Sequence, residues 1–335
     1  MAKERAQEFL TRCKSLRILI MGDLMVDRYL WGSIDRISPE APVPVVEIQR
    51  EESRLGGAAN AALNISSMGA TPILCGSIGN DTGGEKFLEL CGEVGFNTEL
   101  IFALDSRKTT VKTRIISQGQ QVLRVDSEDR APLSGEENSH VMGQLFDRIP
   151  EFDAIIFSDY DKGFLDETLI QMTMVYAQQH NIPVMVDPKF KNFHHFADCT
   201  LFKPNLKELK EGLGVSLDKQ DFPQIVAAVR QLRESMPHPY TLVTLSDAGM
   251  LLIDDYFRYI HLPAHYRNIT DVSGAGDTVM SVATLAVAAG LTQLEAAEFA
   301  NLSGGLVCEE VGVIPIRPER LLDEVIRLQK TQKVS

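Results

Sequence analysis

The sequence predicts an α/β fold in which a mainly parallel sheet is covered by helices on both faces. Short apolar runs alternate with helical patterns through most of the 335 residues, and this alternation is typical of βαβ units. A hydrophobic fraction of 44% is ample for a large buried core. Because no linker rich in Pro, Gly or Ser, no low-complexity tract and no internal repeat interrupts the pattern, we expect residues 1–335 to form a single domain.

Each element of this fold is assigned from the period of its apolar residues. The predicted strands are Leu16–Met21, Ile73–Ser77, Ala154–Ser158, Pro183–Val186, Thr200–Phe202 and Leu242–Leu245. The predicted helices are Ala58–Met68, Glu85–Glu93, Glu136–Arg148, Asp166–His180, Phe222–Glu234, Asp277–Ala289 and Gln293–Glu309.

Two segments break the alternation. Pro42–Gln49 is predicted to be an extended, proline-flanked strand, and Thr109–Val125 is predicted to form two strands around a tight turn at Gln118-Gly119. Since neither is followed by a helix, we expect them to form a small antiparallel β lid. This lid would comprise residues 33–50 and 109–126.

The turn at residues 118 and 119 also predicts a register for the second part of the lid. With a two-residue loop, Arg114 pairs with Leu123. Lys112 and Arg114 would then share one face of the lid with Leu123 and Val125. A slip of one residue would move both cations to the other face, so this face assignment depends on a regular ladder.

Charge and composition exclude several classes of protein. The net charge of −13 argues against nucleic-acid and anionic-membrane partners. The five cysteines are scattered and form no CxxC pair, which favours reduced core thiols. The N-terminus has no apolar signal core, and the longest apolar stretch, Val279 to Leu291, is too short to span a membrane. We therefore expect a cytoplasmic protein.

The strongest local signal is Asp-Val-Ser-Gly-Ala-Gly-Asp at residues 271–277, followed at once by a helix of small residues. Gly274, Ala275 and Gly276 would let backbone N–H groups turn toward an anion, and the helix start adds its positive end. Such a cradle can hold the terminal phosphates of ATP. Asp277 at its edge can accept the proton of an attacking hydroxyl. The structural alternative, a glycine turn with Asp capping a helix, stays open on this motif alone.

Two features of this motif limit its interpretation. The helix start should favour the ionised form of Asp277 and make it a weak base, which a loose phosphoryl-transfer transition state tolerates. The Lys-Ser/Thr ending of a Walker A loop is absent, and no GxGxxG follows the first strand, where Met21-Gly22-Asp23 stands instead. Dinucleotide-dependent oxidoreductases are therefore disfavoured.

A second group of polar residues lies at Lys203-Pro204-Asn205-Leu206-Lys207-Glu208, after a predicted strand. Asn205 and Glu208 are three apart and share one face of the first helical turn. Their oxygens suit Mg²⁺, which keeps several waters and bridges to phosphate. A capping box, with Asn205 as N-cap and Glu208 closing it, is the structural alternative.

Together, Asn205-x-x-Glu208 and the later Gly-Ala-Gly-Asp277 resemble the ribokinase-type (PfkB) carbohydrate kinases, and the resemblance covers nearly the whole chain. It implies a three-layer ribokinase-like sandwich with a β lid, ATP and Mg²⁺ as cofactors, and allows a monovalent cation. Asp277 would be the base, and Asn205 and Glu208 would organise Mg²⁺ through water. The implied nucleotide contacts are Thr244, Ser246, Gly249 and Asn301, and the implied sugar contacts are Asp23, Asp27, Gly56, Gly57 and Asn60.

A narrower resemblance is to the kinases of bacterial heptose metabolism. It rests on the stretches at residues 22–32 and 36–46, on Ser-Asp-Tyr-Asp-Lys-Gly at 158–163 and on Val-Asp-Pro-Lys at 186–189. It implies phosphorylation of D-glycero-D-manno-heptose 7-phosphate at the anomeric 1-hydroxyl, giving the 1,7-bisphosphate for the lipopolysaccharide precursor ADP-heptose. The phosphate of such a substrate needs cations at the end of the site remote from ATP, and Arg114, Lys162 and Lys189 are the candidates.

The same resemblance implies partners. Many relatives are fused to a C-terminal nucleotidyltransferase, and we expect a separate polypeptide to perform that step here. An exposed β lid tends to be covered, so we expect a homodimer through the lids. Two other functions stay open: a kinase for another sugar, sugar phosphate or nucleoside, and a non-catalytic ligand-binding regulator on the same scaffold.

Overall fold

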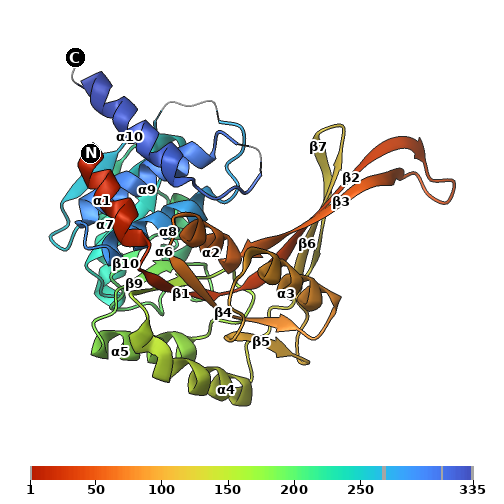
Figure 1. The fold of residues 1–335 in the computed structure, drawn as a ribbon, viewed down its shortest axis with the longest axis horizontal. Coiled ribbons are helices and arrows are strands. Elements are labelled where there is room, and N and C mark those ends of the chain that lie inside the picture. The colour runs from red at the N-terminus through yellow and green to blue at the C-terminus, as the bar shows by residue number, and fades with distance from the viewer. Residues whose placement is uncertain (1, 266–268, 311, 333–335) are drawn as a thin grey trace.

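The chain folds around a long twisted sheet, shown in the computed structural model, which describes residues 2–265, 269–310 and 312–332 (Figure 1). Nine strands form this sheet in the described part of the chain. In spatial order they are β13 (Tyr259–Leu262), β12 (Met250–Ile253), β11 (Tyr240–Thr244), β10 (Leu201–Phe202), β9 (Val184–Asp187), β8 (Ala154–Ser158), β1 (Arg17–Gly22), β4 (Thr71–Gly79) and β5 (Ile101–Leu104).

Strands β11 to β5 run parallel, and only β12 and β13 are antiparallel, at one edge. The predicted mainly parallel sheet is confirmed. All six strands expected from the sequence are present within one or two residues at either end. The three short edge strands β5, β12 and β13 were not predicted, since runs of four residues carry too little periodicity.

Alternate residues of the central strands face two separate apolar cores, which makes the fold a three-layer sandwich. In β1, Ile18 and Ile20 belong to one core, whereas Leu19 and Met21 belong to the other. The first core is covered by α1 (Lys3–Cys13), α2 (Ala58–Ser67), α3 (Thr82–Val94), α8 (Ala275–Ala288), α9 (Gln293–Val307) and α10 (Pro318–Gln332). The second is covered by α4 (Gly135–Leu145), α5 (Glu167–Gln179), α6 (Leu206–Leu213) and α7 (Phe222–Ser235).

The first and last helices lie side by side, so the two ends of the described chain meet on one side of the sandwich (Figure 1). Two short 3-10 helices, at Phe146–Glu151 and Ser246–Ala248, are the remaining helices of the described residues. No helix among these residues combines the length and apolar character that a membrane crossing requires.

A second, four-stranded sheet projects from the sandwich as two long ribbons (Figure 1). Its order is β3 (Pro44–Gly57), β2 (Leu24–Ile37), β6 (Thr110–Ser117) and β7 (Gln120–Ser127). The pairings β2–β3 and β6–β7 are antiparallel, as expected, whereas the central pairing β2–β6 is parallel. The strands also run closer to the main sheet than the predicted segments 33–50 and 109–126, because β2 begins only two residues after β1 ends.

The predicted turn at Gln118-Gly119 is present, with φ of 51° and 77°, the geometry that suits a two-residue hairpin. The predicted pairing beyond it is wrong. A bulge between Ile115 and Ile116 shifts the ladder by one residue, so that Arg114 faces Arg124 and Ile115 faces Leu123. Because of this shift, Lys112 and Arg114 lie on the opposite face of the lid from Leu123 and Val125.

One face of the lid is charged, and the opposite face is largely apolar. Paired residues share a face, so Lys112 and Arg114 lie with Asp27 and Tyr29 on the charged face. The opposite face carries Leu30, Ile115, Leu123 and Val125.

Candidate active site

The candidate site lies at the carboxyl ends of the parallel strands, where ligands of open α/β sheets bind. Five strands deliver polar residues to this edge: Asp23 follows β1, Tyr160 follows β8, Asp187 ends β9, Lys203 follows β10 and Thr244 ends β11. Helix α8 begins at the same edge, so its first turn meets residues that are far away in the sequence.

Asp277 lies in the first turn of α8 and is only 8% exposed. The hydroxyl of Tyr160 donates a hydrogen bond of 2.6 Å to its Oδ1. The side chain of Asn60, in the first turn of α2, hydrogen-bonds the same carboxylate. Three separate elements therefore fix the orientation of this carboxylate.

The surroundings of Asp277 make it a stronger base than its place at a helix start suggests. Burial has the largest effect on its pKa and raises it, as does the charge of Asp187, while the hydrogen bond from Tyr160 and the charge of Lys203 lower it; the net pKa is about 6. The expectation of a weak base considered the helix start alone. Desolvation is the larger effect in the folded chain.

The predicted anion cradle forms the start of α8. Gly274 is the N-cap and has a φ of 77°, a left-handed conformation that disfavours a side chain. Gly276 is helical, and a Cβ built on it would lie 3.8 Å from Nζ of Lys203. Lys203 is 3% exposed and pairs with Asp187 at 3.0 Å. A buried ammonium group thus lies directly beside the N–H groups of the helix start.

A cavity of about 740 Å³ opens beside this cradle. Five of the six residues expected to bind the nucleotide or the metal line this cavity: Asn205, Thr244, Ser246, Gly249 and Asn301. The sixth, Glu208, does not. Ala275 and Gly276 of the cradle also line it. Its surface is mostly apolar, and Lys207, Lys210 and Lys219 are among the polar residues that line it. An apolar cavity that ends at an anion cradle suits a flat base joined to a phosphate chain.

Asn205 and Glu208 form the capping box that the sequence offered as the structural alternative. The Glu208 N–H donates to Asn205 Oδ1 and the Asn205 N–H donates to Glu208 Oε2, both at 2.8 Å. The other Glu208 oxygen is paired with Lys189. Among the described residues, no group of three or more His, Cys, Asp and Glu side chains is arranged as a metal site. Because both Glu208 oxygens have partners, this oxygen-rich corner fits Mg²⁺ through water rather than by direct coordination.

At the other end of the site, Asp23 is 2% exposed and accepts three backbone hydrogen bonds. The donors are the N–H groups of Tyr160 at 2.9 Å, Lys162 at 3.1 Å and Phe164 at 3.2 Å. Its oxygens thus hold the loop that carries Tyr160 toward Asp277. In this arrangement Asp23 positions a loop and leaves little access for a sugar.

Asp27, on the charged face of the lid, pairs with Arg114 at 2.5 Å. A Cβ on Gly56 would meet Asp27 Oδ2 at 2.6 Å, so only glycine leaves room for that carboxylate. Gly57 has a φ of 59° and is the N-cap of α2, from which Asn60 reaches Asp277. The glycine pair therefore joins the lid to the helix that contacts the Asp277 carboxylate.

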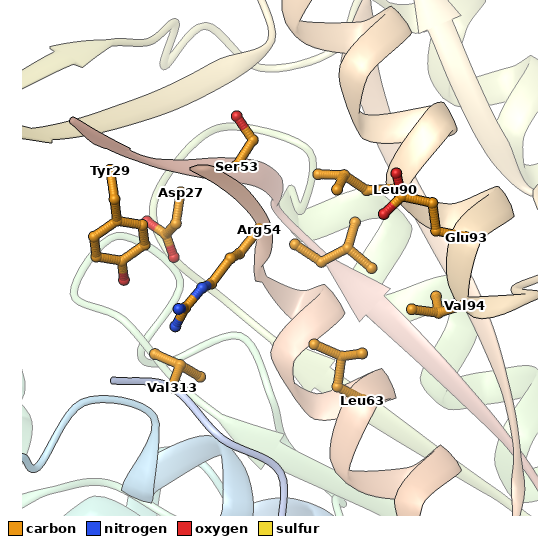
Figure 2. A pocket seen from close by; sticks show the side chains of 10 residues that line it. Asp27, Tyr29, Ser53, Arg54, Leu63, Leu90, Glu93, Val94 and Val313 are labelled. Atoms are coloured by element: carbon orange, nitrogen blue, oxygen red, sulfur yellow. The ribbon is translucent and has the colours of Figure 1, made fainter. Parts of the chain in front are cut away.

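A smaller cavity of about 200 Å³ lies behind the lid base, between β2, β3, α2 and α3 (Figure 2). The Arg54 side chain extends between Asp27 and Tyr29 on one side and Val313 on the other (Figure 2). Its guanidinium lies 5.1 Å from the Tyr29 ring. A Cβ built on Gly312 would lie 3.0 Å from Nη1 of Arg54, so this side chain also adjoins the segment that follows α9.

Like Arg114, the other two expected phosphate ligands, Lys162 and Lys189, each have a carboxylate partner. Lys162 is 8% exposed and pairs with Glu128 at 2.7 Å, and Lys189 pairs with Glu208. Each carboxylate already neutralises the charge that the sequence assigned to substrate.

Tyr160, Asp187 and Lys203 are the residues that sequence reasoning missed. Asp187 and Lys203 lie inside segments already singled out, directly after predicted strands, and their position at the strand ends was the available signal. Tyr160 also lies inside such a segment, two residues after a predicted strand, but its bond to Asp277 could not be predicted, because the two residues are 117 positions apart.

The comparisons with known proteins agree with this geometry. The family model of the pfkB family carbohydrate kinases matches residues 16–320. The chain belongs to this family, and it is a carbohydrate kinase. The ribokinase-like fold expected from the sequence is confirmed.

Among curated proteins, the chain is similar to proteins named bifunctional protein HldE. The identity is 37% over 325 residues for that of Pelobacter propionicus, covering 97% of this chain and 66% of the relative. It is 41% over 312 residues for that of Methylobacillus flagellatus, covering 92% and 63%. The chain thus spans less than two thirds of the length of these relatives.

Among solved structures, the fold is similar to that of Escherichia coli phosphofructokinase-2 in complex with potassium. The TM-score is 0.76 at 18% identity, with 94% of this chain and 99% of that chain covered. Arabidopsis thaliana ribokinase complexed with ribose and ATP gives a TM-score of 0.73 at 16% identity, covering 93% and 99%.

Proposed function

We propose that this carbohydrate kinase transfers the γ-phosphoryl group of ATP to the anomeric 1-hydroxyl of D-glycero-D-manno-heptose 7-phosphate, with Asp277 as general base. The observation that carries the proposal is the position of Asp277. Its buried carboxylate follows Ala275 and Gly276, which line the large apolar cavity, and it is bonded to Tyr160, whose ring centre lies 5.8 Å from Lys112 Nζ and 5.9 Å from Lys189 Nζ.

In the proposed step, the acceptor hydroxyl oxygen bonds to the γ-phosphorus as the bond from that phosphorus to the β–γ bridging oxygen breaks. The hydroxyl proton passes to Asp277, and ADP leaves with the bond's electron pair. The N–H groups at residues 274–276 and the Lys203 ammonium stabilise the charge on the phosphoryl oxygens. Asn60 and Tyr160 hold the carboxylate in place.

Mg²⁺ held through water by Asn205 and Glu208 would neutralise the phosphate chain of the nucleotide when bound. The nucleotide itself would lie in the cavity lined by Thr244, Ser246, Gly249 and Asn301. In the described structure Asn301 donates to the Pro263 carbonyl at 3.0 Å, which fixes one wall of that cavity.

The choice of heptose 7-phosphate rests on the segments shared with the kinases of bacterial heptose metabolism. The similarity to proteins named HldE supports it. The product would be the 1,7-bisphosphate, a precursor of ADP-heptose, and a nucleotidyl-transfer reaction would consume it. We also propose one domain over residues 1–335, a homodimer through the lids and a cytoplasmic location.

A substrate panel tests the proposal. Purified protein, ATP and Mg²⁺ are incubated with heptose 7-phosphate, fructose 1-phosphate, unphosphorylated sugars and a nucleoside. Phosphorus NMR then identifies the product. We expect the highest kcat/KM for heptose 7-phosphate and a new anomeric phosphate signal; a higher value for another acceptor would overturn the substrate assignment.

The variant Asp277→Asn tests the mechanism separately. It keeps the size of the side chain but cannot accept the proton, so kcat should fall by about 10²–10⁴-fold. Near-normal turnover would refute the role of Asp277, and absence of turnover on every acceptor in the wild type would favour the non-catalytic alternative.

A further inference from the structure

Five cations on the lid and at the strand ends are candidates for binding the acceptor phosphate, and four of them have a carboxylate partner. Lys162 pairs with Glu128 at 2.7 Å and Lys203 pairs with Asp187 at 3.0 Å. Lys189 pairs with Glu208, and Arg114 pairs with Asp27 at 2.5 Å. These four charges are balanced before any substrate arrives.

Lys112 is the exception. It lies on β6, is half-buried, and has no carboxylate within ion-pair distance in the part of the chain that the structure describes. Burial and the nearby charge of Lys162 lower its pKa, and Asp27 and Asp126 offset this only in part. Holding a desolvated ammonium group without a partner is unfavourable, so an anion arriving at this point would gain a strong interaction.

The position of Lys112 relates it to the catalytic carboxylate through one aromatic ring. Its Nζ lies 5.8 Å from the centre of the Tyr160 ring, whose hydroxyl donates to Asp277. In the ladder between β2 and β6, the backbone of Lys112 lies opposite that of Asp27, so both side chains are on the charged face, although Asp27 forms its ion pair with Arg114. An acceptor whose reactive hydroxyl contacts Asp277 would therefore extend its far end along Tyr160 toward Lys112.

We propose that Lys112 binds the phosphate group already carried by the acceptor and makes the kinase selective for phosphorylated sugars. This inference rests on the proposed function and refines it. Arg114, Lys162 and Lys189 could bind that phosphate only by sharing or losing their own carboxylate partners, whereas Lys112 gains a partner. The lid thus contributes a charge that selects the substrate.

The test compares each phosphorylated sugar with its unphosphorylated counterpart in the variant Lys112→Met, which keeps the length of the side chain and removes its charge. We expect kcat/KM for the phosphorylated sugar to fall by about tenfold or more, since hydrogen bonds to charged groups are the strong ones. The value for the unphosphorylated sugar should stay unchanged, and Lys112→Arg should retain most of the selectivity. The matched control is Lys108→Met, at an exposed lysine just before β6. It should not change the ratio of kcat/KM for the phosphorylated sugar to kcat/KM for the unphosphorylated sugar.

An equal loss on both acceptors, or an unchanged ratio, would overturn the proposal. Thermal unfolding checks each variant, and Lys112→Gln replaces the Met variant if that one does not fold. If the wild type prefers a phosphorylated sugar other than heptose 7-phosphate, the substrate assignment fails while the ratio test applies to that sugar. If the wild type shows no preference for any phosphorylated acceptor, the role of Lys112 fails.

Discussion

At the scale of single residues, the pKa of the proposed base Asp277 depends more on its neighbours than on its own helix. A helix start stabilises a negative charge by a fraction of a kcal/mol up to about 2 kcal/mol, whereas the loss of solvent around Asp277 has the larger and opposite effect. Asp187 adds to that effect, and Lys203 and Tyr160 oppose it. The resulting pKa of about 6 keeps the carboxylate ionised at neutral pH and still able to take a proton.

This balance predicts the pH dependence of activity. The base must be deprotonated, so kcat/KM should rise through a pH of about 6 and level off above it. In Tyr160→Phe the hydrogen bond that lowers the pKa of Asp277 is lost, and the acidic limb should move to higher pH. At pH 8.5 the kcat/KM of Tyr160→Phe should be about 2–10-fold lower than that of the wild type, which corresponds to the free energy of one hydrogen bond.

The measurement is a pH profile of kcat/KM for both proteins. Tyr176→Phe serves as the control, because this tyrosine packs on Phe146 away from the site. An acidic limb that stays in place in Tyr160→Phe would show that the hydroxyl does not tune the base.

The sequence indicates the residues of the site that belong to short local motifs. Asp277, the cradle glycines and the capping box at Asn205 and Glu208 each carry a local pattern, and the structure brings the cradle and the box to the same cavity. It does not indicate Tyr160, since the 2.6 Å bond to Asp277 depends on how β8 and α8 pack. Nor does it reveal that Lys162, Lys189 and Arg114 already have partners, because ion pairs are set by tertiary distances.

At the scale of elements, Asn64 holds the two helices of the site together. It is 1% exposed, and its Oδ1 accepts hydrogen bonds from Thr278 Oγ1 of α8 and from the Ile316 N–H, both at 3.0 Å. Its Nδ2 donates to the Asn60 carbonyl at 2.9 Å within α2. Asn64 therefore connects Asn60, one turn earlier on α2, to Thr278, the residue that follows Asp277 on α8.

Asn64→Leu is nearly isosteric and removes all three bonds. It leaves the Ile316 N–H buried without its partner, whereas Thr278 Oγ1 keeps a 3.2 Å bond to the Gly274 carbonyl. We expect it to lower the free energy of unfolding by about 2–4 kcal/mol, since each unsatisfied buried group costs about 1–3 kcal/mol. Urea unfolding measures the change. Ser281→Ala removes a single 3.2 Å bond between the same two helices and should cost about 1 kcal/mol; equal effects of the two substitutions would contradict the proposed role of Asn64.

The lid shows where pattern reasoning at this scale stops. The turn at Gln118-Gly119 is predictable because its residues tolerate positive φ. The bulge between Ile115 and Ile116 has no such marker, and it exchanges the neighbours of Arg114. Helices and buried strands were predictable because their apolar period persists over many residues, whereas a bulge is a single-residue event.

At the scale of the whole molecule, the two faces of the lid suit two different tasks. The charged face carries Lys112 and Arg114 toward the site, and the opposite face exposes Leu123 and Val125 to 54% and 51%. An exposed apolar sheet face is unfavourable in water. The proposed dimer would cover it with the same face of a second copy.

Leu123→Glu would place a charge in the centre of that interface. We expect the variant to sediment as a monomer where the wild type sediments as a dimer, measured by analytical ultracentrifugation at the same concentrations. Arg124→Gln changes the neighbouring residue on the charged face and should leave the dimer intact. A wild type that is monomeric at micromolar concentration would refute the dimer.

The stability of the whole fold should depend on one buried carboxylate beneath the site. Asp159 is 2% exposed, and burial together with the nearby charge of Asp23 raises its pKa to about 7, far above the ordinary value of 3.8. The folded chain therefore holds a proton at this position that the unfolded chain has released. Its contribution to stability is complete below a pH of about 4 and is lost as the pH rises to about 7.

Asp159→Asn removes this titration, so its melting temperature should change less between pH 5 and pH 8 than that of the wild type. The slope is the informative quantity, because the substitution also alters the bonds to Asn192 and to the Asp161 N–H at every pH. Calorimetry across this range measures it, with Asp255→Asn at an exposed position as the control. If the variant and the wild type show the same slope, the proton is not held at Asp159, and the loop that carries Tyr160 is stabilised without it.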